Sequence, residues 1–139
     1  MYCDTSALLK LYVHEPGSDQ FNRAVEGRTD LVVSDLTVTE LVSALVRRVR
    51  SGGASAEHAR RVRRAVVESM DAGVYQRLDL SRDVHRRAEH LLLTLPVALR
   101  AADALHLALA LTAHAASMAV FDTRLATAAR AVGLAVYPA

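Results

Sequence analysis

The chain is poor in cysteine and lysine, and each shortage narrows what the protein can be. Cys3 is the one cysteine, so no internal disulfide can form and a metal site built on several cysteines is excluded. We expect Cys3 to act as a small buried hydrophobic residue. Lys10 is the one lysine among 17 basic residues, so arginine, which binds phosphate bidentately, carries almost all of the positive charge.

Long apolar runs and export signals are also missing. The longest apolar run, residues 104–116, is interrupted by His106, Thr112 and His114 and is too short to cross a bilayer. The first predicted strand begins at Met1, which leaves no room for a signal peptide ahead of it. We therefore expect a cytoplasmic protein.

Several catalytic signatures are absent as well. The chain has no Gly-x-Ser-x-Gly elbow, no Walker loop and no glycine fingerprint for a dinucleotide. Its six histidines form no metal-binding pair on an acidic face. The chemistry of this protein must therefore come from another set of side chains.

The composition indicates a folded protein with a substantial core. The chain has 139 residues, 52% of them hydrophobic, and a mean hydropathy of +0.16, so we expect a single domain over residues 1–139. Short apolar runs alternate with helical patterns, which favours an α/β sandwich with a parallel sheet. The predicted strands are 2–3, 31–34, 118–121 and 134–137, residues 74–78 are either a strand or an extended linker, and the predicted helices are 6–12, 18–26, 35–51, 55–71, 81–95, 101–115 and 123–131.

The longer helices carry apolar stripes that should face the core. In the helix beginning at Asp35, the apolar residues follow the i, i+3, i+4, i+7 spacing of one buried face. Gly52 and Gly53 end this helix, and the next one should complete an antiparallel pair. The residues predicted to face inward are Val38, Leu41, Val42, Leu45, Val46 and Val49 in the first helix, Ala59, Val62, Ala65, Val66 and Met70 in the second, and Val84, Ala88, Leu91, Leu92 and Leu95 in helix 81–95.

The same helical pair carries a dense group of arginines. Two interpretations stay open at this point: a solvated helix face, or a basic patch that binds nucleic acid. The net charge of only +2 shows that any such patch is local. The group consists of Arg47, Arg48, Arg50, Arg60, Arg61, Arg63 and Arg64.

Four acidic residues lie where apolar neighbours dominate: Asp4, Glu40, Asp103 and Asp122. Carboxylates rarely occupy such surroundings without partners. Asp4 and Asp122 each follow a predicted strand and precede a helix, so right-handed parallel connections should bring both to the same edge of the sheet. We therefore expect these two side chains to be neighbours.

Each acid also has a simpler explanation. Asp4 would serve well as a helix N-cap, and Asp103 as a stabilising charge in the first turn of its helix. Glu40 lies off the apolar stripe, beside the small residues Ser43 and Ala44, which leave room for an ion or a phosphate. Four converging carboxylates would repel one another unless a cation neutralised them, and ligands that are all oxygen favour Mg²⁺ or Mn²⁺.

His106, three residues after Asp103, has two possible roles. It is either a core residue that supports the acids, which is the commoner situation, or a general base or metal ligand. Arg47, two turns after Glu40, would point toward the same place and could contact a phosphate.

Taken together, these motifs resemble those of the PIN-domain ribonucleases, specifically the VapC-type toxins. The resemblance covers essentially the whole chain, and the motifs follow the family order and spacing. No motif is specific alone, but the set is. The matching stretches are residues 4–12 (DTSALLKLY), Glu40 at the head of a helix, residues 99–108 (LRAADALHLA), residues 121–125 (FDTRL) and residues 128–133 (AARAVG).

The resemblance implies a three-layer α/β/α fold and cleavage of RNA that depends on Mg²⁺ or Mn²⁺. It assigns Asp4, Glu40, Asp103 and Asp122 to the family's catalytic and metal-binding acids, with Ser6 supporting the first of them. Arg47 and Arg100 are candidates for binding the substrate. Val120 stands where many members carry Thr or Ser, so a hydrogen bond near Asp122 is either missing or supplied by Thr123.

The resemblance also implies partners: a homodimer and a small antitoxin protein. An apolar antitoxin helix would lie near Leu11, Tyr12 and Phe21, while one of its basic side chains enters the acidic pocket. Two other functions compete with the ribonuclease: a non-catalytic RNA-binding or protein-interaction domain, and a phosphatase with Asp4 as nucleophile. Ser6 argues against the phosphatase, because that chemistry usually needs a second acid at this position.

Overall fold

A computed structural model describes residues 1–139 and places five parallel strands in the order β3-β2-β1-β4-β5. The central strand is β1, where Tyr2 pairs with Val32 on one side and with Met118 on the other. The predicted parallel α/β sheet is therefore present. The strands are β1 (Tyr2–Cys3), β2 (Val32–Ser34), β3 (Gln76–Leu78), β4 (Ser117–Ala119) and β5 (Ala135–Tyr137).

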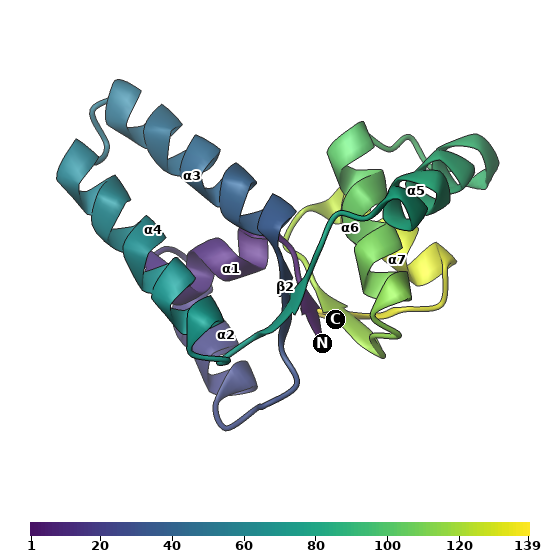
Figure 1. Ribbon diagram of the computed structural model, residues 1–139, viewed down its shortest axis with the longest axis horizontal. Coiled ribbons are helices and arrows are strands. Elements are labelled where there is room, and N and C mark those ends of the chain that lie inside the picture. The colour runs from purple at the N-terminus through teal and green to yellow at the C-terminus, as the bar shows by residue number, and fades with distance from the viewer.

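Helices cover both faces of the sheet (Figure 1). Successive strand side chains point to opposite faces, so Tyr2 joins one buried cluster and Cys3 the other. The first cluster lies under α5, α6 and α7, and the second under α1 to α4. The helices are α1 (Thr5–Tyr12), α2 (Ser18–Val25), α3 (Asp35–Arg50), α4 (Ala56–Asp71), α5 (Arg82–Thr94), α6 (Ala101–Thr112) and α7 (Thr123–Ala131).

The helix starts follow local capping chemistry. Ser34, Ser55 and Ser81 each accept a hydrogen bond from a backbone N–H two or three residues into the helix that follows. Residues 74–78, left open between strand and linker, contain the edge strand β3. The predicted helix 101–115 ends earlier than expected, at Thr112, because His114 adopts a left-handed backbone conformation with φ of 51°.

Two residues predicted to face the core do not. Val46 is 37% exposed and Leu92 is 43% exposed. Both follow a correctly placed residue, Leu45 or Leu91, and one step along a helix turns the side chain by about 100°. The periodicity gives the direction of the buried stripe, but the covered face is narrower than we predicted. No helix has both the length and the apolar character needed to cross a membrane.

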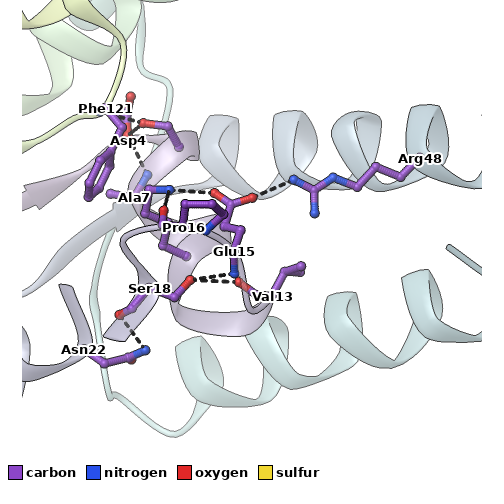
Figure 2. Close-up of polar contacts among 11 residues, drawn as sticks. Asp4, Ala7, Val13, Glu15, Pro16, Ser18, Asn22, Arg48 and Phe121 are labelled. Carbon is purple, nitrogen blue, oxygen red and sulfur yellow. Dashed lines mark hydrogen bonds and ion pairs between the residues drawn. The ribbon is translucent and has the colours of Figure 1, made fainter. Parts of the chain in front are cut away.

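A charged group joins α1 to α3 beside the sheet edge. Lys10 is almost fully buried, and its ammonium donates to Glu15 at 2.8 Å and to the backbone carbonyl of Pro16 at 2.7 Å. Arg48 donates to the second oxygen of the Glu15 carboxylate at 2.7 Å (Figure 2). The Lys10 ammonium also lies 4.5 Å from the centre of the Phe121 ring. Glu15 therefore neutralises a buried cation and fixes α3 against the first helix.

We expect Glu15→Gln to lower the free energy of unfolding by about 1–2 kcal/mol, because the buried Lys10 loses its anionic partner. Burial alone would raise the pKa of Glu15, but hydrogen bonds from Lys10 and Arg48 outweigh it and lower that pKa. The ion pairs therefore stabilise the fold above the ordinary glutamate pKa and are lost as the pH falls through the lowered value. Urea unfolding at pH 7 and pH 3 measures both effects. Equal free energies of unfolding for the wild-type protein and Glu15→Gln at pH 7 would contradict the prediction.

Candidate active site

The acids gather where the direction of the chain changes within the sheet. From β1 the chain proceeds to β2 on one side and later to β4 on the other, so a crevice opens at the carboxyl ends of β1 and β4. Asp4 follows β1 directly, and its backbone N–H donates to the carbonyl of Ala119 at 3.1 Å. Asp122 follows β4 and begins α7. The sheet therefore brings residues 118 positions apart to one edge.

All four predicted acids line one cavity of about 530 Å³. The two arginines proposed for substrate binding line it too. The structure therefore brings together the predicted residues, with Thr123 as the exception. The full lining is Asp4, Thr5, Ser6, Leu9, Glu40, Ser43, Ala44, Arg47, Arg100, Ala102, Asp103, His106, Asp122 and Leu125.

Three of the acids hydrogen-bond the backbone at the start of a helix and still keep an oxygen for another ligand. Asp4 Oδ1 accepts from the Ala7 backbone N–H at 2.8 Å, and Asp122 Oδ1 accepts from that of Leu125 at 2.9 Å. Asp103 Oδ2 accepts from the backbone N–H of Arg100 at 3.1 Å. In each carboxylate the second oxygen has no hydrogen-bond partner in the protein. The capping roles and a role in binding are therefore compatible.

Glu40 is held differently, through groups from two other elements. His106 of α6 lies 2.9 Å from Glu40 Oε2 through its Nε2 atom, and the hydroxyl of Thr5 donates to the same oxygen. Oε1 has no hydrogen-bond partner. The carboxylate is therefore fixed through one oxygen and open at the other.

The pKa values of Asp4 and Glu40 are shifted in opposite directions. Burial raises the pKa of Asp4 to about 6, although hydrogen bonds from Ser6 and from the Ala7 N–H oppose the shift. The hydrogen bond with His106 lowers the pKa of Glu40 in spite of its partial burial. Near neutral pH the pocket therefore contains a firmly ionised Glu40 and an Asp4 carboxylate that burial makes costly to ionise.

The donor set fits a hard cation with a partly open coordination shell. In the structure, no group of three or more His, Cys, Asp or Glu side chains is already close enough together to hold a metal ion. However, the cavity offers four carboxylates with one unengaged oxygen each, and Mg²⁺ is often bound through one or two carboxylates while it keeps several waters. The most deeply buried of these acids, Asp4, has the most to gain from a nearby positive charge.

Ser6 has the supporting position expected of it. Its hydroxyl donates to Asp4 Oδ1 at 2.7 Å and accepts from the backbone N–H of Phe121 at 2.9 Å, so it connects the two strand ends that carry Asp4 and Asp122. Thr123 does not supply the hydrogen bond considered for it, because its hydroxyl makes no contact of this kind with Asp122. Val120 is buried in the hydrophobic core and leaves that hydrogen bond missing.

Sequence reasoning missed two members of the site, Tyr2 and Thr5. Tyr2 was interpreted only as part of a buried strand, yet its hydroxyl lies 2.7 Å from Nδ1 of His106. Thr5 contacts Glu40 from the first turn of α1. The available signal was the alternation along β1, which turns Tyr2 toward α6 and leaves its hydroxyl in need of a buried partner.

We expect Asp4→Asn to stabilise the metal-free protein at pH 7.5 by about 1–3 kcal/mol, because it removes a buried charge and keeps an oxygen that accepts from Ser6 and Ala7. The native pKa of Asp4, about 6, lies above the unfolded value of about 3.9. The cost of ionising Asp4 is therefore fully present above pH 6 and is lost as the pH falls toward 4. Denaturant unfolding at pH 7.5 and pH 4 should show the difference shrinking at the lower pH. A stability difference between Asp4→Asn and the wild-type protein that grows at pH 4 would refute the raised pKa of Asp4.

Known proteins resemble this chain in both sequence and fold. Residues 1–131 match the family model of the PIN domain. The chain is 36% identical to Ribonuclease VapC46 of Mycobacterium tuberculosis over 138 residues, which cover 98% of this chain and 95% of that protein.

Two solved structures have the same architecture at low sequence identity. The crystal structure of Mycobacterium tuberculosis VapC20, described as a Sarcin-Ricin loop cleaving toxin, superposes with a TM-score of 0.72 at 18% identity, over 91% of this chain and 93% of that one. The crystal structure of FitAcB from Neisseria gonorrhoeae superposes with a TM-score of 0.68 at 18% identity, over 98% of this chain and 95% of that one. The expected three-layer α/β/α fold is thereby confirmed, and the chain belongs to the PIN-domain family.

Proposed function

We propose that this protein is an endoribonuclease that depends on Mg²⁺ or Mn²⁺ and is the toxin of a toxin-antitoxin pair. One observation carries the proposal: four carboxylates with free oxygens line a single cavity beside two arginines. The 36% identity to Ribonuclease VapC46 supports the choice of RNA as substrate. We place the activity in the cytoplasm, where its RNA substrates are.

The side chains divide the work of hydrolysis between them. Asp4, Glu40, Asp103 and Asp122 would hold the divalent cation through their free oxygens. When bound, such an ion lowers the pKa of a water molecule and stabilises the negative charge that develops on the phosphate. Arg47 belongs to α3 and Arg100 precedes α6, and both line the same cavity. We expect them to hold the phosphates of the RNA.

Hydrolysis by this arrangement needs no side-chain nucleophile. Water adds to the phosphorus, one P–O bond breaks, and the leaving oxygen takes up a proton. Ser6 contributes by fixing Asp4, because its hydroxyl ties that carboxylate to the backbone of Phe121. The catalytic edge is thereby held in one geometry before the substrate arrives.

Purified protein without a partner should cut RNA in the presence of Mg²⁺ or Mn²⁺ and stop when a chelator is added. Asp4→Asn and Asp103→Asn should each abolish cleavage, since they remove charge at nearly constant volume. Glu68→Gln is the matched control, because Glu68 is an exposed acid on α4 outside the cavity. Cleavage of labelled total RNA, followed by gel analysis and end sequencing, measures the effect. Full activity of either aspartate variant, or RNA cleavage by the wild-type protein that persists in excess chelator, would disprove the mechanism.

The structure offers a second apolar surface for the proposed antitoxin besides the one predicted near Leu11, Tyr12 and Phe21. Of these three residues, Phe21 is fully buried against Phe121 and Tyr137, whereas Leu11 and Tyr12 are half-buried. An apolar hollow of about 340 Å³ lies between α3 and α4. Its lining includes the apolar residues Val42, Val46 and Val49 and the arginines Arg50, Arg60 and Arg63.

The charge and shape of this hollow fit an amphipathic antitoxin helix with acidic flanks. Its apolar side chains would cover the exposed Val46, and its acids would pair with the arginines that line the hollow. A basic side chain from the same partner could then reach the acidic cavity and take the place of the cation. A bound guanidinium would satisfy the carboxylates bidentately.

We expect Val46→Glu to prevent copurification with the antitoxin while RNA cleavage by the isolated protein stays intact. The new charge would sit in the apolar hollow and repel an acidic helix, and Val46 is exposed enough for the fold to tolerate it. Leu93→Glu is the matched control, because Leu93 is 86% exposed on α5, on the other face of the sheet. Co-expression with the neighbouring small reading frame and pull-down gives the measurement. Retention of the partner by the Val46 variant would rule out this surface.

A non-catalytic RNA-binding domain of the same fold is the competing function. It predicts RNA affinity without turnover and no divalent-ion binding by calorimetry. The shared cavity of four acids favours the enzyme, because a surface that only binds RNA gains nothing from concentrated negative charge. The predicted homodimer is a separate part of the proposal, which light scattering of the isolated protein would test.

A further inference from the structure

A chain of buried polar groups runs from the core to Glu40 and has no part in the mechanism so far. Tyr2 is 0% exposed and His106 is 2% exposed. The Tyr2 hydroxyl lies 3.1 Å from Ser34 Oγ and 2.7 Å from His106 Nδ1, and His106 Nε2 lies 2.9 Å from Glu40 Oε2. Such a buried chain is costly to form unless each group is satisfied, and no buried side-chain polar atom is left without a partner.

The three contacts are compatible with one arrangement in which every donor points toward Glu40. A carboxylate oxygen only accepts, so Nε2 of His106 is the donor in the contact with Glu40 Oε2. Burial raises the pKa of Tyr2, so the phenol keeps its proton. When the Tyr2 hydroxyl donates to Nδ1, its oxygen is free to accept from Ser34, and both ring nitrogens of His106 have a partner. In this arrangement the donors point in one direction, toward the carboxylate.

The position of His106 gives this chain access to two acids at once. His106 lies three residues after Asp103 on α6, so both side chains occupy the same face of the helix. Glu40 belongs to α3, which packs on the other face of the sheet. The imidazole is thus the group that connects the Glu40 carboxylate to the helix of Asp103 across the cavity.

Anchoring one oxygen leaves the other in a defined place. A free glutamate side chain loses up to about 2 kcal/mol of rotational entropy when it is fixed. His106 and Thr5 both hold Oε2, so this ordering is already present before a ligand arrives. Glu40 lines the cavity, and its Oε1 has no hydrogen-bond partner. Groups that hold a metal-binding carboxylate in this way commonly change metal affinity by about 10- to 100-fold when they are removed.

We propose that the Tyr2–His106 pair is a positioning device that orients Glu40 for the divalent cation of the site. His106 acts through Glu40 and does not contact the RNA or the ion itself. Tyr2 holds the imidazole ring from its other nitrogen, Nδ1. The inference rests on the proposed function, because it needs the acidic cavity to bind a cation.

Mn²⁺ binding by calorimetry, compared across three variants, tests the proposal. His106→Leu removes the donor at similar size and should weaken Mn²⁺ binding by about 10-fold. His106→Gln places an amide N–H near the position of Nε2 and should restore most of the affinity. Tyr2→Phe keeps the aromatic ring in the core but no longer holds the imidazole at Nδ1, and it should weaken Mn²⁺ binding a few-fold. Thermal unfolding without metal shows whether each variant is folded.

A second readout does not depend on metal. The ¹⁵N chemical shifts of the His106 ring in the wild-type protein should show a proton on Nε2 and a hydrogen-bonded Nδ1, and the Nδ1 shift should move in Tyr2→Phe, which lacks the hydroxyl. If His106→Leu does not fold, Tyr2→Phe still decides the question through both measurements.

The outcomes separate this inference from the proposed function. The positioning role would be overturned if the wild-type protein binds Mn²⁺ and cuts RNA while His106→Leu, His106→Gln and Tyr2→Phe bind Mn²⁺ with unchanged affinity. The proposed nuclease function would stand in that case. Affinity losses that follow losses of thermal stability, with no rescue by Gln, would reduce the pair to core packing. Wild-type protein that neither binds Mn²⁺ nor cuts RNA would remove the proposed function and this inference together.

Discussion

The structure depends on placing one carboxylate, that of Asp4, at the end of the central strand where almost no water reaches it. The strand is only two residues long, and both of them are fully buried. The backbone of Asp4 therefore continues the sheet, while its side chain begins α1 and faces the crevice. Burial makes this anion expensive, and the helix N-terminus and Ser6 compensate only part of the cost. An unmet demand for positive charge is thus built into the centre of the fold.

Much of the surrounding architecture meets the geometric needs of that position. Parallel strands with right-handed connections place Asp122 at the same edge, and Ser6 locks the two strand ends together. On the far side of the cavity, α3 and α6 come from opposite layers, and the contact between His106 and Glu40 joins them. The stability of the core and the geometry of the cavity therefore rest on the same short segments.

Local chemistry in the sequence was enough to predict most elements and the set of acids. Serines before α3, α4 and α5 marked helix starts, and the strand-to-helix position of Asp4 and Asp122 predicted their common edge. Sequence could not show how wide a buried stripe becomes, which is why Val46 was misplaced. It also could not reveal the contact of Tyr2 with His106, since residues 104 positions apart meet only through the register of β1 against the helix above it.

The single lysine has a consequence for how the cell, or an experimenter, can modify this protein. Lys10 is enclosed by Glu15, the Pro16 carbonyl and the Phe121 ring, so its amine is not presented to solvent. Enzymes that acetylate or ubiquitinate lysine side chains, and reagents that acylate them, find no accessible target while the chain is folded. All the remaining basic side chains are arginines, which stay charged at every physiological pH. The positive surface is therefore permanent, and labelling of Lys10 would report directly on opening of the contact between α1 and the strand end at Phe121.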